Sequence, residues 1–102
     1  MNPTGTLKKG AKPTAIFNLP NGAEVVRQAD ALEYAVISQW GNEGRCYRSY
    51  STKAEALARL AIVSELIQNN LSKFVDGYTL YVMEAQPDNT YNSIKKYVKG
   101  GK

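Results

Sequence analysis

The chain has 102 residues, of which 43% are hydrophobic and 22% charged, and its formal net charge is +4. This length and composition fit one globular domain and exclude a second domain of usual size or a wholly disordered chain. A single cysteine excludes an intrachain disulfide and favours a reducing, cytoplasmic location. No stretch approaches the roughly 20 apolar residues of a membrane span, and the N-terminus lacks the apolar core of a signal peptide.

The N-terminal part of the chain predicts an arm followed by a hairpin. Residues 1–13 mix Gly, Pro, Thr and Lys without periodicity, which predicts a flexible basic arm. The apolar or β-branched segments 14–19 and 23–27 then flank Pro20-Asn21-Gly22, a strong turn signal. They predict the first hairpin of a single domain that we expect to cover residues 14–99.

A second hairpin is predicted from residues 34–40 and 45–50. Both segments are rich in aromatic and β-branched residues, and they flank the Gly-containing turn 41–44. Side chains alternate between the two faces of a strand, so Val36 and Trp40 share one face and Ile37 lies on the other. Because neither face is wholly polar, we expect both to be partly covered.

The segment after this hairpin predicts the main helix. Thr52 followed three residues later by Glu55 is a capping box, in which each side chain accepts a hydrogen bond from the other residue's backbone N–H. Apolar residues then recur at helical spacing as far as Ile67, and Asn69-Asn70 should end the helix.

Beyond the helix, residues 78–85 alternate as in a strand, and Gln86-Pro87-Asp88-Asn89 breaks it. Residues 90–98 predict a short C-terminal helix, and 100–102 a disordered tail. The expected fold class is α+β: an antiparallel sheet of about four to five strands packed against one main helix.

The positive charge lies mainly at the two ends. Seven of the thirteen basic residues are within residues 8–12 and 95–102, whereas residues 13–94 carry six bases and all nine acids. The body therefore has a net charge of −3, and the basic ends either bind phosphate or serve as solubilising termini.

The sequence lacks the usual equipment of catalysis. It has no histidine, which removes the commonest general base and metal ligand, and it has no Gly-rich phosphate loop. The nine acids are expected to be solvated or to cap elements, and Cys46, without a histidine to activate it, is expected to be a buried, inert thiol. We therefore expect a protein that is not an enzyme and needs no cofactor or metal.

The second hairpin and the basic ends supply the candidate binding residues. Aromatic rings stack on unpaired bases, and the forked donors of arginine pair with phosphate. The alternative is that the aromatic residues are core residues packed under the helix. The candidates are Trp40, Arg45, Tyr47, Arg48 and Tyr50 in the hairpin, and Lys8, Lys9, Lys12, Lys95 and Lys96 at the ends.

The pattern Tyr34-Ala35-Val36-Ile37, a Gly-containing turn, 45–50, and then Ser51 to Ala56 resembles the sheet-then-helix part of AP2-type and integrase arm-binding DNA modules. The resemblance covers about a third of the chain and implies that Arg45, Tyr47 and Arg48 would enter a DNA groove. In those families a third strand precedes the helix and the sheet is more basic, and this chain departs from both features.

The sequence thus predicts a small binding protein whose partner is nucleic acid. An alternative is a phage- or plasmid-type accessory protein that binds and inhibits or modulates a host protein, since Tyr, Trp and Arg dominate interface hot spots. A small-ligand-binding domain is a third reading. The strand at 78–85, if exposed, would also pair with its own copy and form a homodimer.

Overall fold

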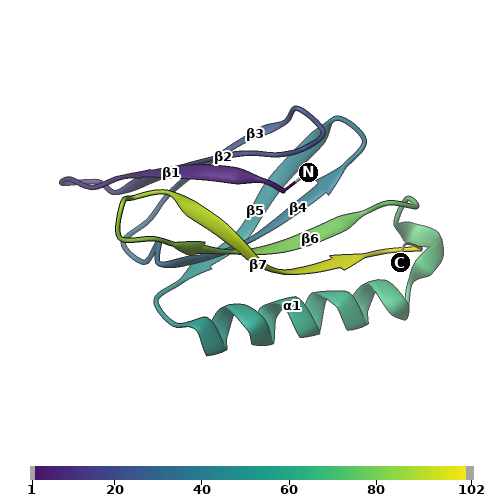
Figure 1. Cartoon of the computed structure of the whole chain (residues 1–102). Coiled ribbons are helices and arrows are strands. Elements are labelled where there is room, and N and C mark those ends of the chain that lie inside the picture. Colours follow the sequence, from purple (N-terminus) through teal and green to yellow (C-terminus); the bar gives the residue numbers. More distant parts are fainter. Residues whose placement is uncertain (1, 101–102) are drawn as a thin grey trace.

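The computed structural model describes residues 2–100 and contains two antiparallel sheets and one long helix. In order along the chain, the elements are β1 (Thr4–Lys8), β2 (Thr14–Asn18), β3 (Glu24–Gln28), β4 (Tyr34–Trp40), β5 (Glu43–Tyr50), α1 (Lys53–Gln68), the 3₁₀ turn η1 (Leu71–Lys73), β6 (Thr79–Ala85) and β7 (Tyr91–Val98). They form three layers, with one sheet above, a second sheet in the middle and α1 below (Figure 1). The predicted α+β fold, with a sheet against one main helix, is confirmed.

Sheet A has the strand order β1-β2-β3. The predicted first hairpin is present as β2 and β3, which pair from Thr14–Gln28 to Asn18–Glu24. The prediction of a flexible arm over residues 1–13 is wrong for residues 4–8, because β1 pairs along its whole length with β2. Glycine is uncommon inside strands, so Gly5 weakened the strand pattern of this segment. Packing explains the glycine, because a Cβ at this position would lie 2.8 Å from the ring of Phe17.

Sheet B has the strand order β5-β4-β6-β7. The predicted second hairpin is confirmed as β4 and β5. β6 pairs with β4 on one side and β7 on the other, so the strand at 78–85 has no free edge for a homodimer and that expectation is corrected. The predicted helix at 90–98 is also wrong, because these residues form β7. Of the predicted tail, residues 101 and 102 lie outside the described residues.

Each edge strand of sheet B contains a β-bulge. In β5, Arg48 pairs with Val36 of β4 and Cys46 pairs with Ile37 of β4, which leaves Tyr47 as the extra residue of β5. In β7 the same shift leaves Ile94 as the extra residue. A bulge interrupts the period-two alternation, so residues three apart can share a face. Tyr47 and Tyr50 accordingly pack on the same side of sheet B, as do Ile94 and Tyr97.

Helix α1 begins and ends where the sequence predicts. The Thr52 hydroxyl accepts a hydrogen bond from the Glu55 backbone N–H at 3.3 Å and donates one to the Glu55 carboxylate at 2.8 Å. Ala56, Leu60, Val63 and Ile67 are buried against sheet B, at the spacing of one helix face.

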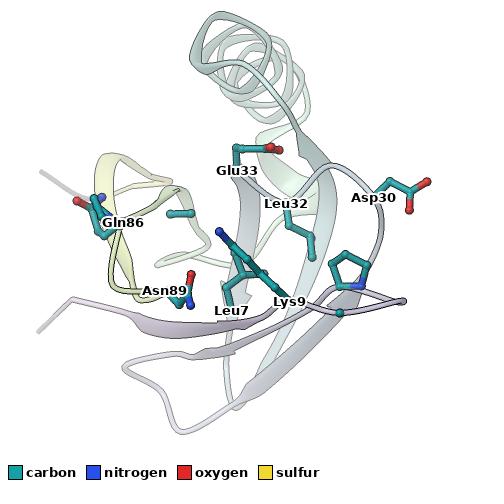
Figure 2. Close-up of a pocket in the computed structure, with 11 residues that line it drawn as sticks. Leu7, Lys9, Asp30, Leu32, Glu33, Gln86 and Asn89 are labelled. Atoms are coloured by element: carbon teal, nitrogen blue, oxygen red, sulfur yellow. The ribbon is translucent and has the colours of Figure 1, made fainter.

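Sheet B contributes to two apolar cores. One fills the space between the sheets and includes Phe17, Ile37 and Met83, and the other lies between sheet B and α1 and includes Val36, Ile67 and Leu80. At one end of the sandwich the β1–β2 loop, the β3–β4 connection and the β6–β7 turn surround an open cavity (Figure 2). No helix within residues 2–100 is long and apolar enough to cross a lipid bilayer.

Candidate functional site

The five candidate residues of the second hairpin lie on the side of sheet B that faces α1. Trp40, Tyr47 and Tyr50 pack against the helix-side core. Arg48 pairs with Val36 and Arg45 with Ser38, and both partners belong to the helix-facing side of β4. Without the bulge, alternation would put Tyr47 and Tyr50 on opposite faces, so the bulge is what assembles this surface. We call Arg45, Tyr47, Arg48 and Tyr50 the β5 face.

The aromatic rings of this region are engaged with one another. Trp40 stacks on Tyr78 with ring centroids 5.6 Å apart and planes inclined by 18°, and Phe74 meets the same tyrosine edge-on. The hydroxyls of Tyr47 and Tyr78 are 2.6 Å apart and share a hydrogen bond. Burial of the ring and this hydrogen bond raise the pKa of Tyr47, which therefore stays neutral. Trp40, Tyr47 and Tyr50 are thus half-buried and pack against the helix-side core, as the alternative reading of the aromatic residues expected in part.

The arginine side chains remain outside this core. The Arg45 guanidinium lies 4.9 Å from the centre of the Tyr47 ring, so a cation–π contact orients it. Arg45 and Arg48 are both exposed, and neither forms an ion pair within residues 2–100. Their forked donors are free to bind an anion.

The other two arginines of the chain also reach β5. Arg27, on β3, donates from Nε to the hydroxyl of Ser49 at 3.4 Å. Arg59, on α1, donates from Nε to the hydroxyl of Tyr50 at 2.9 Å. Arg59 therefore lies beside the β5 face. Arg27 lies on the other side of β5, because Ser49 pairs with Ala35 of the core between the sheets.

The candidate lysines lie elsewhere. Lys8 ends β1, and Lys9 and Lys12 lie in the loop that joins β1 to β2. Lys95 and Lys96 are on β7, at the opposite edge of sheet B from β5. The structure thus separates the basic residues into three groups and does not join the lysines to the β5 face.

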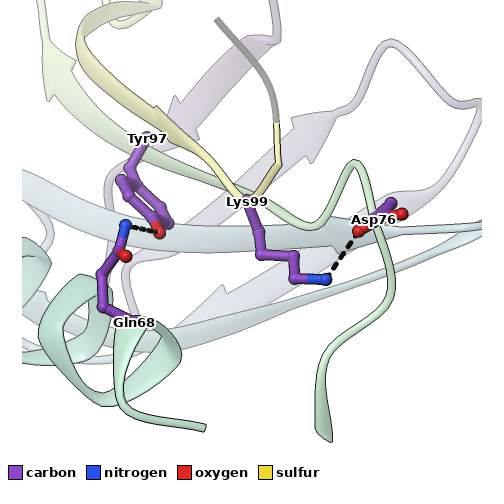
Figure 3. A network of polar contacts seen from close by, with 4 residues as sticks. All are labelled: Gln68, Asp76, Tyr97 and Lys99. Atoms are coloured by element: carbon purple, nitrogen blue, oxygen red, sulfur yellow. Dashed lines mark hydrogen bonds and ion pairs between the residues drawn. The ribbon is translucent and has the colours of Figure 1, made fainter. Parts of the chain in front are cut away.

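The C-terminal end of β7 is fastened to the helical side of the molecule. Lys99 forms an ion pair with Asp76 at 2.6 Å, the one ion pair within residues 2–100, and it holds the pKa of that carboxyl below its usual value. Gln68 at the end of α1 donates to the Tyr97 hydroxyl at 2.6 Å (Figure 3). Lys99 is therefore a structural residue rather than a free cation.

Cys46 points away from the β5 face. Its side chain packs with the core between the sheets, and its thiol donates a weak hydrogen bond to the Arg48 carbonyl at 3.5 Å. Burial raises the pKa of Cys46 to about 11, although the nearby Arg27 and Arg45 act in the opposite direction. Among residues 2–100, no three carboxylate or thiol side chains come close enough to hold a metal ion.

Sequence reasoning missed three residues of this region. Tyr78, which immediately precedes β6, could have been found, because its alternation with Leu80 and Val82 places the three side chains on the same side. Arg27 and Arg59 carried no signal, since their contacts with β5 depend on how sheet A and α1 pack against that strand.

Comparisons with protein-family models, with curated proteins and with solved structures gave no match. The resemblance to AP2-type and integrase arm-binding modules gains no support from them. The strand that completes the three-stranded unit here is β6, which follows α1 instead of preceding it.

Proposed function

We propose that the protein binds nucleic acid through the β5 face, by contacts between arginine side chains and phosphates. The observation that carries this proposal is the presence of three of the four arginines on or beside the β5 face: Arg45 and Arg48 are exposed and free of carboxylate partners, and Arg59 hydrogen-bonds to Tyr50. Arginine binds phosphate through two parallel N–H···O bonds, and a row of such contacts follows a nucleic-acid backbone.

The state of the aromatic rings supports contacts to phosphates rather than to bases. Trp40 and Tyr47 already stack on or hydrogen-bond to Tyr78, and Tyr47 supports Arg45. A base that stacked on the Tyr47 ring would have to displace the Arg45 guanidinium from it. The binding we propose is therefore tolerant of sequence, because phosphate contacts carry no direct sequence information.

Fluorescence anisotropy with a labelled DNA oligonucleotide tests the proposal. Affinity should fall steeply between about 50 and 200 mM NaCl, and Arg45→Ala with Arg48→Ala should reduce the slope of log K against log salt by about 2. Lys95→Ala with Lys96→Ala is the matched control, since it removes two charges from the opposite edge of the sheet. Equal losses in the two double variants, or no loss in the arginine variant, would contradict the β5 face as the binding site.

A second candidate function, binding to a host protein as an accessory factor, is favoured by an exposed apolar surface on α1. Ile62 is 60% and Leu66 54% exposed, and Leu71 and Val75 beyond the helix are also exposed. Ile62 and Leu66 share a helix side with Arg59, which contacts β5, so the apolar surface adjoins the β5 face. Exposed apolar groups beside arginine are typical of protein interfaces.

Affinity capture from nuclease-treated lysate separates these two functions. Protein binding predicts a stoichiometric partner that is retained by the wild-type chain and lost by Ile62→Ser with Leu66→Ser. Nucleic-acid binding predicts that the same variant, whose net charge is unchanged, keeps its affinity for the oligonucleotide.

A further inference from the structure

The cavity at the open end of the sandwich is a second place where the structure gathers polar and apolar groups. It has a volume of about 480 Å³, within the ~300–1,000 Å³ range of ligand pockets. Three segments far apart in sequence surround it: the β1–β2 loop, residues 29–33 between β3 and β4, and residues 86–90 between β6 and β7. None of its lining residues belongs to the β5 face.

The floor of this cavity is apolar and firmly held. Leu7, Leu32 and Ala85 line it and belong to the core between the sheets, with Leu32 only 3% exposed. Backbone hydrogen bonds join the surrounding segments: Leu7 N–H donates to the Asn89 carbonyl at 2.8 Å, and Ala85 N–H donates to the Glu33 carbonyl at 2.9 Å. The cavity is therefore built from paired backbone and is formed without a ligand.

Two side chains of opposite charge, Lys9 and Glu33, also line this cavity. Figure 2 shows the Lys9 side chain extending across the cavity and Glu33 on its far side, whereas the Asp30 carboxylate is turned away from both. Lys9 and Glu33 do not form an ion pair with each other or with any other residue in 2–100. An ammonium and a carboxylate are thus both left free around one apolar surface.

We propose that this cavity binds a small zwitterion with a compact apolar group, of the α-amino acid class. The ligand's carboxylate would pair with the Lys9 ammonium and its amino group with the Glu33 carboxylate, while its side chain would cover Leu7, Leu32 and Ala85. A ligand with one charge would pair with only one of the two groups and would leave the other without a counterion. This site is independent of the β5 face.

The proposal is tested with L-leucine, N-acetyl-L-leucine and L-leucinamide as probes of the 102-residue chain, by ¹H–¹⁵N NMR titration. L-leucine should shift the amides of the three segments around the cavity. The acetylated and amidated derivatives, which each lack one charge, should bind about tenfold more weakly, since each loses a charge-assisted hydrogen bond.

Variants assign each charge to its partner. Lys9→Gln should abolish the preference for L-leucine over L-leucinamide, and Glu33→Gln should abolish the preference over N-acetyl-L-leucine. Lys12→Gln, in the same loop but outside the cavity, should leave both preferences unchanged. The proposal is overturned if millimolar L-leucine shifts none of these amides, or if the three probes bind the wild-type chain equally.

Discussion

Single side chains around β5 are divided between two environments by the direction in which they point. Cys46 faces the core between the sheets, whereas its neighbours Arg45 and Tyr47 face α1. The sequence places the thiol between two arginines, an arrangement that would activate a thiolate if all three were on one side. In the fold, burial of the thiol is instead the largest influence on its pKa, and it raises that pKa.

We therefore predict that Cys46 is unreactive in the folded protein. Because burial raises the pKa of Cys46 to about 11, the thiolate fraction at pH 8 should be roughly a hundredfold lower than for an unperturbed thiol. Alkylation by iodoacetamide, followed by mass spectrometry, should be slow in buffer and fast in denaturant. Equal rates in the two conditions would show that the thiol is accessible and ionised as in a free peptide.

The ion pair between Asp76 and Lys99 should make stability depend on pH. Lys99 lowers the pKa of Asp76, so the carboxylate stabilises the fold above its unfolded pKa, and this contribution is lost as pH falls through the folded pKa. Asp76→Asn should lower the urea midpoint slightly at pH 6, because the carboxyl is exposed, and leave it unchanged at pH 2. The same loss at both pH values would indicate a packing effect instead.

At the scale of elements, the two bulges explain both a success and an error of sequence reasoning. In β5, the bulge gathers onto one face the aromatic and arginine residues that the sequence shows only as neighbours. In β7, the bulge brings Ile94 and Tyr97 to one face. A spacing of three between apolar residues predicts a helix, so a bulged strand is easily mistaken for one.

The junction between β5 and sheet A depends on a glycine. A Cβ on Gly44 would overlap the Leu19 side chain and lie 3.2 Å from Val25, both in the core between the sheets. Gly44→Ala should therefore lower the free energy of unfolding by about 1–3 kcal/mol, the usual effect of overpacking. Urea denaturation measures this, with Gly10→Ala as the control, because a Cβ on Gly10 meets nothing within 4 Å. A neutral Gly44→Ala would show that the two sheets can move apart at this point.

At the scale of the whole molecule, sheet B is the layer that contributes side chains to both apolar cores. Ile37 and Val36 are adjacent in β4, yet the first is buried against sheet A and the second against α1. Loosening either core disturbs strands that also form the other, so the domain should unfold as one cooperative unit.

Two matched substitutions test this coupling. Ile37→Val in the core between the sheets and Ile67→Val in the helix-side core should each cost about 0.5–1.5 kcal/mol, since both isoleucines are fully buried. Trp40 fluorescence reports on the helix side, and far-UV circular dichroism reports on the whole backbone. Both variants should shift the two urea transitions together. A shift of only one signal would mean that the two cores unfold separately.

The sequence by itself determined the features that depend on neighbouring residues. The Thr52–Glu55 capping box fixed the start of α1, and the Asn21-Gly22 and Gly41–Gly44 turns fixed two hairpins, because these signals act over a few residues. Tertiary structure decided the rest. Pairing with β2 and β6 made strands of β1 and β7, bulges chose which side chains share a face, and packing of sheet A and α1 brought Arg27 and Arg59 to β5. These outcomes depend on partners distant in the sequence, so no local pattern could specify them.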